Sequence, residues 1–421
     1  MWPLSQLLVQ AGYIAQSSSG MYHMLPLAKR VLGKLENLVR AEMSAIGAQE
    51  ISLSTLTGKD LWTHSGRWDT VSSELFRVED RRGAVYCLAP THEEAITTLA
   101  KSYVRSARNM PLYLYQLDRK YRDELRPRSG LLRGREFYMK DLYTFDVDEQ
   151  AARLTYESVV KAYHNLFTHL HVPYVAVEAD TGAIGGSMSH EFQVLAPVGE
   201  DSVTVCHTCD RAANLEVMPG SEAGTTPVAP TDHCQFESHA GIEVGHTFLL
   251  GHKYSSMFDV TYDSPSGPEL AFMGCYGLGT SRILAAVTEA LASENGLRWP
   301  LSLAPYRVAV ITLGASRNDN IESAATCLTE QLNEAMPGDV LLDDRCVDLS
   351  LRQKIATMRL IGVPYVVVVG SRYNARQLEV YDSHNEAPRK IAVHDLIQLA
   401  ALPERDVQLV DIKRDGIHAS S

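Results

Sequence analysis

The chain has 421 residues, of which 45% are hydrophobic and 21% charged, and 51 acidic against 39 basic side chains give it a net charge of −12. This composition is typical of a globular protein with two or three domains, and its acidity argues against nucleic-acid binding by the whole surface. No apolar run approaches the roughly 18 residues of a membrane helix, so we expect no membrane partner.

The first helix that the sequence predicts spans residues 27–47. Apolar side chains recur there every three or four residues, which places them on one helix face, and Gly47 provides a stop. A strand is expected over residues 50–56. No basic residue precedes Lys29, so we expect neither a signal peptide nor an Arg-rich transit peptide.

An acidic loop opens the next helix, which we expect to run through Ala107. Thr91 is placed to cap this helix, with Glu94 three residues later to complete a capping box. The string HEEAI superficially suggests a zinc-protease helix. Ile96 stands where that motif requires a second histidine, so we reject a zinc site here.

Residues 118–141 predict a basic β-hairpin on an otherwise acidic chain. Two segments of period-two alternation flank a loop rich in Arg, Pro and Gly, and basic residues outnumber acidic ones eight to five. Arg122 and Glu124 are expected to share one strand face, with Phe137 on the returning strand. A guanidinium can bind a phosphate, a carboxylate can accept from an amino group, and an aromatic ring can stack on a base, so these three residues suggest a nucleotide site. The alternative is a solvated surface hairpin without a ligand.

Two glycine-rich segments follow. Residues 179–195 predict a turn that leads into a strand with His190, which taken alone is more often a hydrogen-bonded structural histidine. Residues 271–282 predict a strand that contains Cys275, a glycine-rich corner and then a helix that begins near Arg282. Such a corner lets a ligand approach the backbone, and the helix N-terminus favours anionic phosphates.

The seven cysteines are odd in number and scattered, which argues against a disulfide scaffold and for a reducing compartment. Cys206 and Cys209 form one CxxC pair, and His233 and Cys234 follow later. Because this second pair lacks the spacing that structural zinc sites normally show, we expect no metal there.

After a proline-punctuated linker, the last part of the chain alternates strands and helices. This order predicts a mixed, largely parallel sheet with helices on both faces. Strands are expected at 308–313, 340–343, 365–369 and 378–381, and helices at 321–336, 351–361 and 393–402.

These motifs resemble those of the class II aminoacyl-tRNA synthetases. Tyr121–Glu124, YRDE, is similar to the motif 2 signature, which Arg133 and Phe137 would close. The strand and helix around Arg282 resemble motif 3. The first predicted helix and strand resemble motif 1, which builds the dimer interface of the family, although Ser54 stands where the family normally places a proline.

The longer string RDELRPRSGLLRGREFYMKDLYTF is similar to the prolyl-specific branch of that family, in its bacterial and mitochondrial form. Thr91–Glu93 resembles the Thr-x-Glu loop that holds the cationic imino group of proline in this branch, and GGSMSHEFQV resembles a lining segment of its prolyl-adenylate pocket. A loop at 216–241 stands where bacterial members carry an editing domain. The lack of an editing domain at this point resembles the mitochondrial type and implies that the protein does not hydrolyse mischarged alanyl-tRNA.

The resemblance implies that the protein activates proline with ATP and transfers it to the 3′ end of tRNA(Pro) in organellar translation. The implied catalytic residues are Arg122 and Arg282. The implied ATP-binding residues are Arg122, Glu124, Arg133, Phe137 and Arg282. The implied proline-binding residues are Thr91, Glu93, Arg122, His190 and Cys275. Mg²⁺ is expected on the phosphates, with Glu243 as an acid that could face it.

The implied fold is α/β, with a class II antiparallel sheet flanked by helices over residues 1–300, a linker at 301–305 and an anticodon-binding domain with a mixed sheet at 306–421. The family likeness implies a homodimer in the mitochondrial matrix, with tRNA(Pro), proline and ATP as partners.

Two alternatives remain. Another class IIa synthetase, for threonine or glycine, would share the motifs, but a threonyl site would need zinc ligands that do not accompany them. A catalytically inactive, synthetase-like accessory subunit would bind nucleic acid without chemistry. Such relatives lose the arginines of motifs 2 and 3, which are here Arg122 and Arg282.

Overall fold

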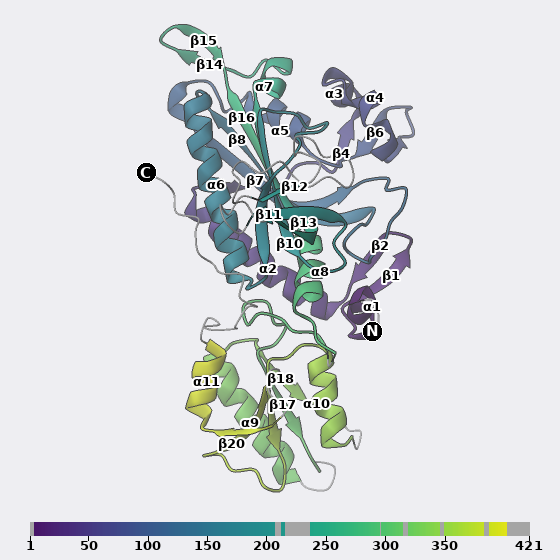
Figure 1. Cartoon of the computed structure of the whole chain (residues 1–421), viewed down its shortest axis with the longest axis vertical. Helices are drawn as coiled ribbons and strands as arrows, with labels where there is room; N and C mark the ends of the chain where they lie inside the picture. Colours follow the sequence, from purple (N-terminus) through teal and green to yellow (C-terminus); the bar gives the residue numbers. More distant parts are fainter. Residues whose placement is uncertain are drawn as a thin grey trace. The chain divides into compact units, whose positions relative to one another are not determined.

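The computed structural model contains two compact units, and Figure 1 labels most of their helices and strands. The central unit has Glu36–Ala286 as its main segment, and the C-terminal unit joins the chain from Val287 onward to two N-terminal segments that end at Ala15 and Leu35. The structure describes residues 4–206, 212–214, 236–294, 296–314, 319–345, 349–382 and 387–401.

The central unit is built on a nine-stranded sheet in the order β10-β9-β12-β11-β13-β16-β8-β7-β3, in which β10 also pairs with β13. Neighbouring strands are antiparallel except for the parallel pairs β3–β7 and β9–β12. The strands are β3 (Gln49–Glu50), β7 (Leu112–Tyr121), β8 (Glu136–Asp146), β9 (Tyr174–Glu178), β10 (Met188–Leu195), β11 (Asp201–Cys206), β12 (Ala212–Asn214), β13 (Phe236–Gly251) and β16 (Phe272–Leu278). The predicted antiparallel sheet is therefore confirmed.

Alternate residues of this sheet pack against helices on its two faces. The helix α6 (Glu149–His169) covers one face, where Tyr163 and Phe167 pack against Phe192 of β10. The helices α5 (Glu93–Ala100) and α7 (Lys253–Met257) lie on the other face, and their Ile96 and Tyr254 share a core with β8, β13 and β16. This alternation leaves the cavity face of β8 to Phe137, Met139 and Asp141.

A smaller three-stranded sheet lies in the same unit, in the order β4 (Leu56–Gly58), β6 (Val85–Leu88), β5 (Arg77–Glu79). The short helices α3 (Lys59–His64), α4 (Arg67–Thr70) and η1 (Ser72–Glu74) accompany it, and their core gathers Trp62, Trp68 and Cys87. The other elements outside the C-terminal sheet are α1 (Leu4–Gln10), β1 (Ile14–Ser18), β2 (Met21–Met24), α2 (Pro26–Ala45), η2 (Ala107–Asn109), β14 (Thr261–Ser264), β15 (Gly267–Leu270) and α8 (Thr280–Leu291).

The C-terminal unit has a five-stranded mixed sheet in the order β18 (Val340–Asp343), β17 (Val308–Thr312), β19 (Tyr365–Val369), β20 (Leu378–Asp382), β21 (Arg389–Ile391). The first three strands are parallel and the last two pairings are antiparallel. The helices α9 (Asp319–Ala335) and α11 (Val393–Ala401) share a core with Val308 and Val310, whereas α10 (Leu351–Leu360) shares another with Ala309 and Ile311. The prediction of helices on both faces is thus confirmed.

Three local predictions were wrong. The helix expected to reach Ala107 ends at Ala100, and the chain then turns so that Ser106 bridges Asp263. The strand expected over 50–56 is replaced by two short strands with irregular backbone between them. Arg122 and Glu124 do not share a strand face, because β7 ends at Tyr121.

Within the ranges that the structure describes, no helix combines the length and the apolar character needed to cross a bilayer.

The side chain of Lys140 is completely buried on the α6 side of β8. Its Nζ donates to the Tyr163 hydroxyl at 2.5 Å and to the Tyr276 carbonyl at 3.1 Å. Burial, which the charge of Asp141 opposes, lowers the pKa of Lys140 from 10.5 to about 7. The folded state thus binds this proton more weakly than the unfolded state, and the free energy of unfolding should rise with pH between about 7 and 10.

We expect Lys140→Met to remove this dependence, because methionine fills similar space without a charge. Between pH 6 and pH 9 the wild type should gain about 2–3 kcal/mol of stability relative to the variant. Urea unfolding at both pH values measures the difference. An equal gain in both proteins would contradict a lowered lysine pKa.

Candidate active site

A cavity of about 740 Å³ opens on the face of the central sheet that carries Phe137 and Cys275. This volume lies within the range of cofactor and small-molecule sites. Its walls come from β8, β13 and β16, from the loop after β7 and from the segment before α8, and Thr91 and Glu93 contribute from the start of α5. Except for His190, every site residue predicted from the sequence lines it.

Two arginines approach each other in the cavity. Among the described residues, no carboxylate lies within ion-pair distance of the Arg122 guanidinium, which is 5.3 Å from the centre of the Phe137 ring. Arg282 donates from Nε to the Leu132 carbonyl and from Nη1 to the carbonyl and carboxylate of Glu243. Burial, followed by repulsion from Arg282, lowers the pKa of Arg122. An anion bound between the two guanidiniums would relieve this repulsion.

Glu124 and Arg133 form an ion pair at the mouth of the cavity. The Arg133 Nε atom is 2.8 Å from Glu124 Oε2, and its Nη1 is 3.3 Å from Glu200 Oε2. Arg128 also pairs with Glu200, at 2.5 Å. The loop after β7 therefore brings both predicted nucleotide contacts together, but each already holds a partner of opposite charge.

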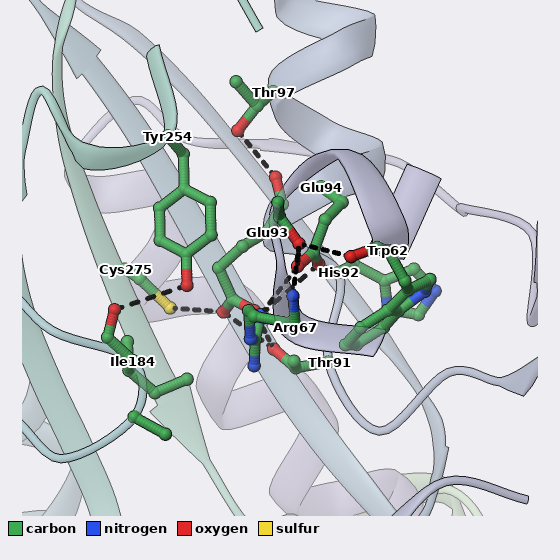
Figure 2. Close-up of polar contacts among 12 residues, drawn as sticks. Trp62, Arg67, Thr91, His92, Glu93, Glu94, Thr97, Ile184, Tyr254 and Cys275 are labelled. Atoms are coloured by element: carbon green, nitrogen blue, oxygen red, sulfur yellow. Dashed lines mark hydrogen bonds and ion pairs between the residues drawn. The ribbon is translucent and has the colours of Figure 1, made fainter. Parts of the chain in front are cut away.

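The carboxylate of Glu93 is completely buried and stands between Thr91, Arg67 and Cys275 (Figure 2). The Thr91 hydroxyl donates at 2.7 Å, the Arg67 Nη1 at 2.9 Å and the Cys275 thiol at 3.3 Å. Burial alone would raise the pKa of Glu93, but the charge of Arg67 and the Thr91 hydrogen bond lower it below its usual value. Glu93 thus presents a fixed negative charge to the cavity.

The predicted capping box at this helix is wrong. The N-cap of α5 is His92 and makes no side-chain cap hydrogen bond. Thr91 uses its hydroxyl on the Glu93 carboxylate, while Glu94 accepts from Arg67 at 3.1 Å and from Ser65 at 2.8 Å. A buried carboxylate is stabilised more by a guanidinium than by exposed backbone donors, which explains why the local capping pattern is not used.

His92 holds the loop between Thr91 and Glu93 in place from behind. Its Nδ1 accepts from Lys120 at 2.9 Å and from Gln116 at 3.0 Å, so its Nε2 carries the proton and donates to the Ser54 carbonyl at 3.1 Å. Burial and the charge of Lys120 lower the pKa of His92. A neutral histidine with both ring nitrogens engaged fixes the position of the loop.

A second buried group supports the same loop. Asp141 pairs with Lys120 at 2.8 Å and accepts from Tyr143 at 3.0 Å. The Tyr143 hydroxyl in turn accepts the backbone N–H of His92 at 3.0 Å. The sheet therefore positions Glu93 through a continuous chain of hydrogen bonds.

His190 does not reach the cavity. Its Nδ1 contacts the Tyr156 hydroxyl of α6 at 2.7 Å. The adjacent Ser189 contacts His246, which lines the cavity, at 2.5 Å. Because side chains alternate along β10, Ser189 faces the cavity side and His190 faces α6. The structure thus gives His190 a structural environment.

Glu191, Glu243 and His246 offer ligand atoms within 4.8 Å of one another. The His246 Nδ1 is 3.2 Å from Glu243 Oε1 and 3.8 Å from Glu191 Oε1. Burial would raise the pKa of Glu243, but the His246 hydrogen bond and the charge of Arg282 bring it down to about 2. An ionised carboxylate beside a second acid and an imidazole fits a divalent cation.

Two features of the site escaped the sequence analysis. Arg67 lies 26 residues before Glu93, and no local pattern connects the two. Glu94 was visible but was assigned to a helix cap. The cysteine cluster of Cys206, Cys209 and Cys234 lies outside the residues whose side chains the structure describes, as does most of the loop predicted at 216–241.

Comparison with protein families identifies two regions of the chain. Residues 76–291 match the family model "tRNA synthetase class II core domain (G, H, P, S and T)". Residues 307–401 match "Anticodon binding domain".

Several relatives align with most of the chain. The "Probable proline--tRNA ligase, mitochondrial" of Schizosaccharomyces pombe is 44% identical over 369 residues, which cover 88% of this chain and 86% of that protein. The human protein of the same name is 46% identical over 376 residues, which cover 87% of this chain and 78% of the human protein. The "Proline--tRNA ligase" of Anaplasma phagocytophilum is 41% identical over 381 residues, with 87% of each chain covered.

A solved structure shares the fold. "Giardia lamblia Prolyl-tRNA synthetase in complex with prolyl-adenylate" superposes with a TM-score of 0.78 at 19% identity, and the match covers 94% of this chain and 74% of that chain. At this identity the likeness supports the architecture alone.

Proposed function

Because this chain belongs to the class II tRNA synthetases, and among them to the proline–tRNA ligases, we propose that its cavity joins proline to ATP as prolyl-adenylate and passes the prolyl group to the 3′ end of tRNA(Pro). One observation carries this proposal. A single cavity holds a buried carboxylate at Glu93 and a repelling pair of guanidiniums at Arg122 and Arg282. The carboxylate matches the ammonium group of an amino acid, and the guanidinium pair matches the phosphates of a nucleotide.

Proline would bind with its imino cation at Thr91 and Glu93. The secondary ammonium offers two N–H donors and a full charge, and Glu93 Oε1 faces the cavity wall where Cys275 supplies a small apolar neighbour. The proline carboxylate would then point toward Arg122. This orientation places the reacting oxygen beside the guanidinium pair.

ATP would bind at the other end of the cavity. Phe137 would stack on adenine while Glu124 accepts from its amino group, and Arg133 and Arg282 would hold the β- and γ-phosphates. Binding would require Arg133 to divide its guanidinium between the nucleotide and its two carboxylate partners, Glu124 and Glu200.

The reaction needs positioning and charge neutralisation rather than covalent work by the protein. A carboxylate oxygen of proline attacks the α-phosphorus in line, and the bond to pyrophosphate breaks. Arg122 would bridge the carboxylate and the α-phosphate and stabilise the charge that develops between them. The terminal ribose of the tRNA then takes the prolyl group and releases AMP.

We also propose that Mg²⁺ accompanies the phosphates, held by Glu243 with Glu191 and His246 nearby. The cation would neutralise phosphate charge; within this chain, Glu243 would both hold it and orient Arg282. The relatives' names favour the mitochondrial matrix as the compartment, and the family likeness favours a homodimer. The domain boundaries at 300 and 306 remain predictions.

ATP–pyrophosphate exchange with single amino acids tests the proposal. We expect exchange with proline, and weak exchange with alanine because the cavity end at Cys275 would also admit a smaller side chain. Glycine, which has no side chain to fill that end, should exchange more weakly than alanine, and threonine should give none. Folded protein that exchanges with no amino acid would contradict the proposal and favour a catalytically inactive accessory subunit.

A further inference from the structure

One guanidinium lies between two buried carboxylates at the proline end of the cavity. Arg67 is 7% exposed, Glu93 is 0% and Glu94 is 1%, and a single nitrogen of Arg67 contacts both acids, at 2.9 Å and 3.1 Å. Figure 2 shows these three side chains together at the start of α5. We call this group the Arg67 trio. With both acids ionised, the trio carries one net negative charge in a site with little water.

The position of Arg67 is fixed by packing on both sides. Its guanidinium carbon lies 5.0 Å from the centre of the Trp62 ring and 5.9 Å from that of Tyr254. Its Nε is buried without a hydrogen-bond partner among the described residues. The two rings and the two carboxylates hold the Arg67 guanidinium beside Glu93, where its charge cancels part of the negative charge.

The single positive charge of Arg67 faces two carboxylates. No other basic side chain among the described residues forms an ion pair with Glu93 or Glu94. Lys253 is in the electrostatic surroundings of the trio, but its Nζ donates to the carbonyls of Ala183 and Ile184. The titratable groups that face the trio are Cys87, His92, Arg122, Tyr143, Lys253, Tyr254 and Cys275.

We propose that Glu94 is a positioning residue for proline recognition: it restores the negative charge that Arg67 cancels at Glu93, so that the trio presents one net negative charge to the imino cation. This inference rests on the proposed function. Glu94 does not need to touch the substrate, because its carboxylate acts through Arg67. Glu93 alone, paired with Arg67, would form a neutral ion pair and attract a cation weakly.

Any proton that Glu94 holds before proline binds would make the trio neutral. Burial, followed by the charge of Glu93, raises the pKa of Glu94, while the charge of Arg67 opposes this rise. When the imino cation enters, its charge compensates the second carboxylate. The O–H bond of the Glu94 carboxyl group then breaks, the electron pair stays on oxygen, and the proton passes to solvent. Proline binding should therefore release protons, in an amount that depends on pH.

Calorimetric titration with proline of the full chain and of Glu94→Gln tests this. The experiment is run near pH 7 in phosphate and in Tris, whose ionisation enthalpies differ, so that the difference in binding enthalpy counts the protons released. We expect release by the wild type, no release by the variant, and proline affinity about ten- to a hundredfold lower in the variant. In exchange assays the KM for proline should rise and kcat should stay constant, because the imino cation does not change during the reaction.

Three controls make the result specific. Glu157→Gln removes an exposed charge from α6 and should bind proline like the wild type. Glu94→Asp keeps the charge and should recover most of the affinity. Tetrahydrofuran-2-carboxylate has the ring of proline with oxygen in place of the imino group, and the preference for proline over it should fall in Glu94→Gln.

The outcomes separate the two proposals. A wild type that neither binds proline nor supports exchange with it overturns the proposed function. A wild type that does both, with Glu94→Gln retaining its affinity or its proton release, overturns the role of Glu94. A variant with reduced kcat and unchanged KM also overturns it, because that result would indicate a structural defect.

Discussion

Arg122→Ala should reduce proline-dependent ATP–pyrophosphate exchange by two to three orders of magnitude. The loss corresponds to about 3–4 kcal/mol of transition-state stabilisation, by analogy with the removal of a donor to a developing oxyanion. The guanidinium lies beside Phe137 in the cavity and near Arg282, and it has no carboxylate partner among the described residues. An arginine kept unpaired against repulsion is available for an anion, and its loss breaks no ion pair of the resting protein.

The loss should fall mainly on kcat, because Arg122 would interact most strongly with the charge that develops between carboxylate and α-phosphate. Arg119→Ala is the matched control. Arg119 lies on β7 three residues earlier, is exposed, and pairs with Glu136 at 2.7 Å outside the cavity. Exchange by Arg122→Ala within a few-fold of the wild type would contradict the catalytic role.

Four of the five described strands of the C-terminal unit were predicted to within one residue at either end, whereas β21 was not predicted, because Arg389 and Lys390 are exposed and charged. Tyr365–Val369 and Val340–Asp343 are bounded by turns, and the alternation of their faces between α9 and α10 requires apolar residues at nearly every position. The β1–β2 hairpin was not predicted, since most side chains of its two strands are exposed or half-buried and give no periodic signal.

The site was less accessible to sequence reasoning, because three of its features depend on tertiary contacts. Period-two alternation puts His190 and Ser189 on opposite faces, but it does not say which face meets the cavity. Arg122 follows β7 instead of belonging to it, so its direction is set by the loop. The sequence around Glu94 fits a capping pattern. Its actual partner, Arg67 of α4, is distant in the sequence and meets it only in the folded protein.

Glu93→Gln should have the largest effect on proline recognition. The amide keeps the shape of the side chain but removes the charge that the imino cation would meet, and it leaves Arg67 paired with Glu94 in a neutral site. Loss of a buried charge pair across an interface costs about 2–5 kcal/mol, so kcat/KM for proline should fall by a factor of about 30 to several thousand. The KM for ATP should not change, because the nucleotide would bind at the other end of the cavity.

The pH dependence of kcat/KM for proline separates the two acids of the trio. Because its folded pKa is lowered, Glu93 stays ionised from its ordinary value of 4.5 upward and should add no titration to kcat/KM between pH 6 and pH 8. Glu94, whose pKa is raised, should instead make kcat/KM of the wild type rise with pH until it is fully ionised. This rise should persist in Glu93→Asp and disappear in Glu94→Gln. If it persists in Glu94→Gln, the titrating group lies elsewhere; if Glu93→Gln recognises proline like the wild type, the cation does not bind at the Thr91–Glu93 loop.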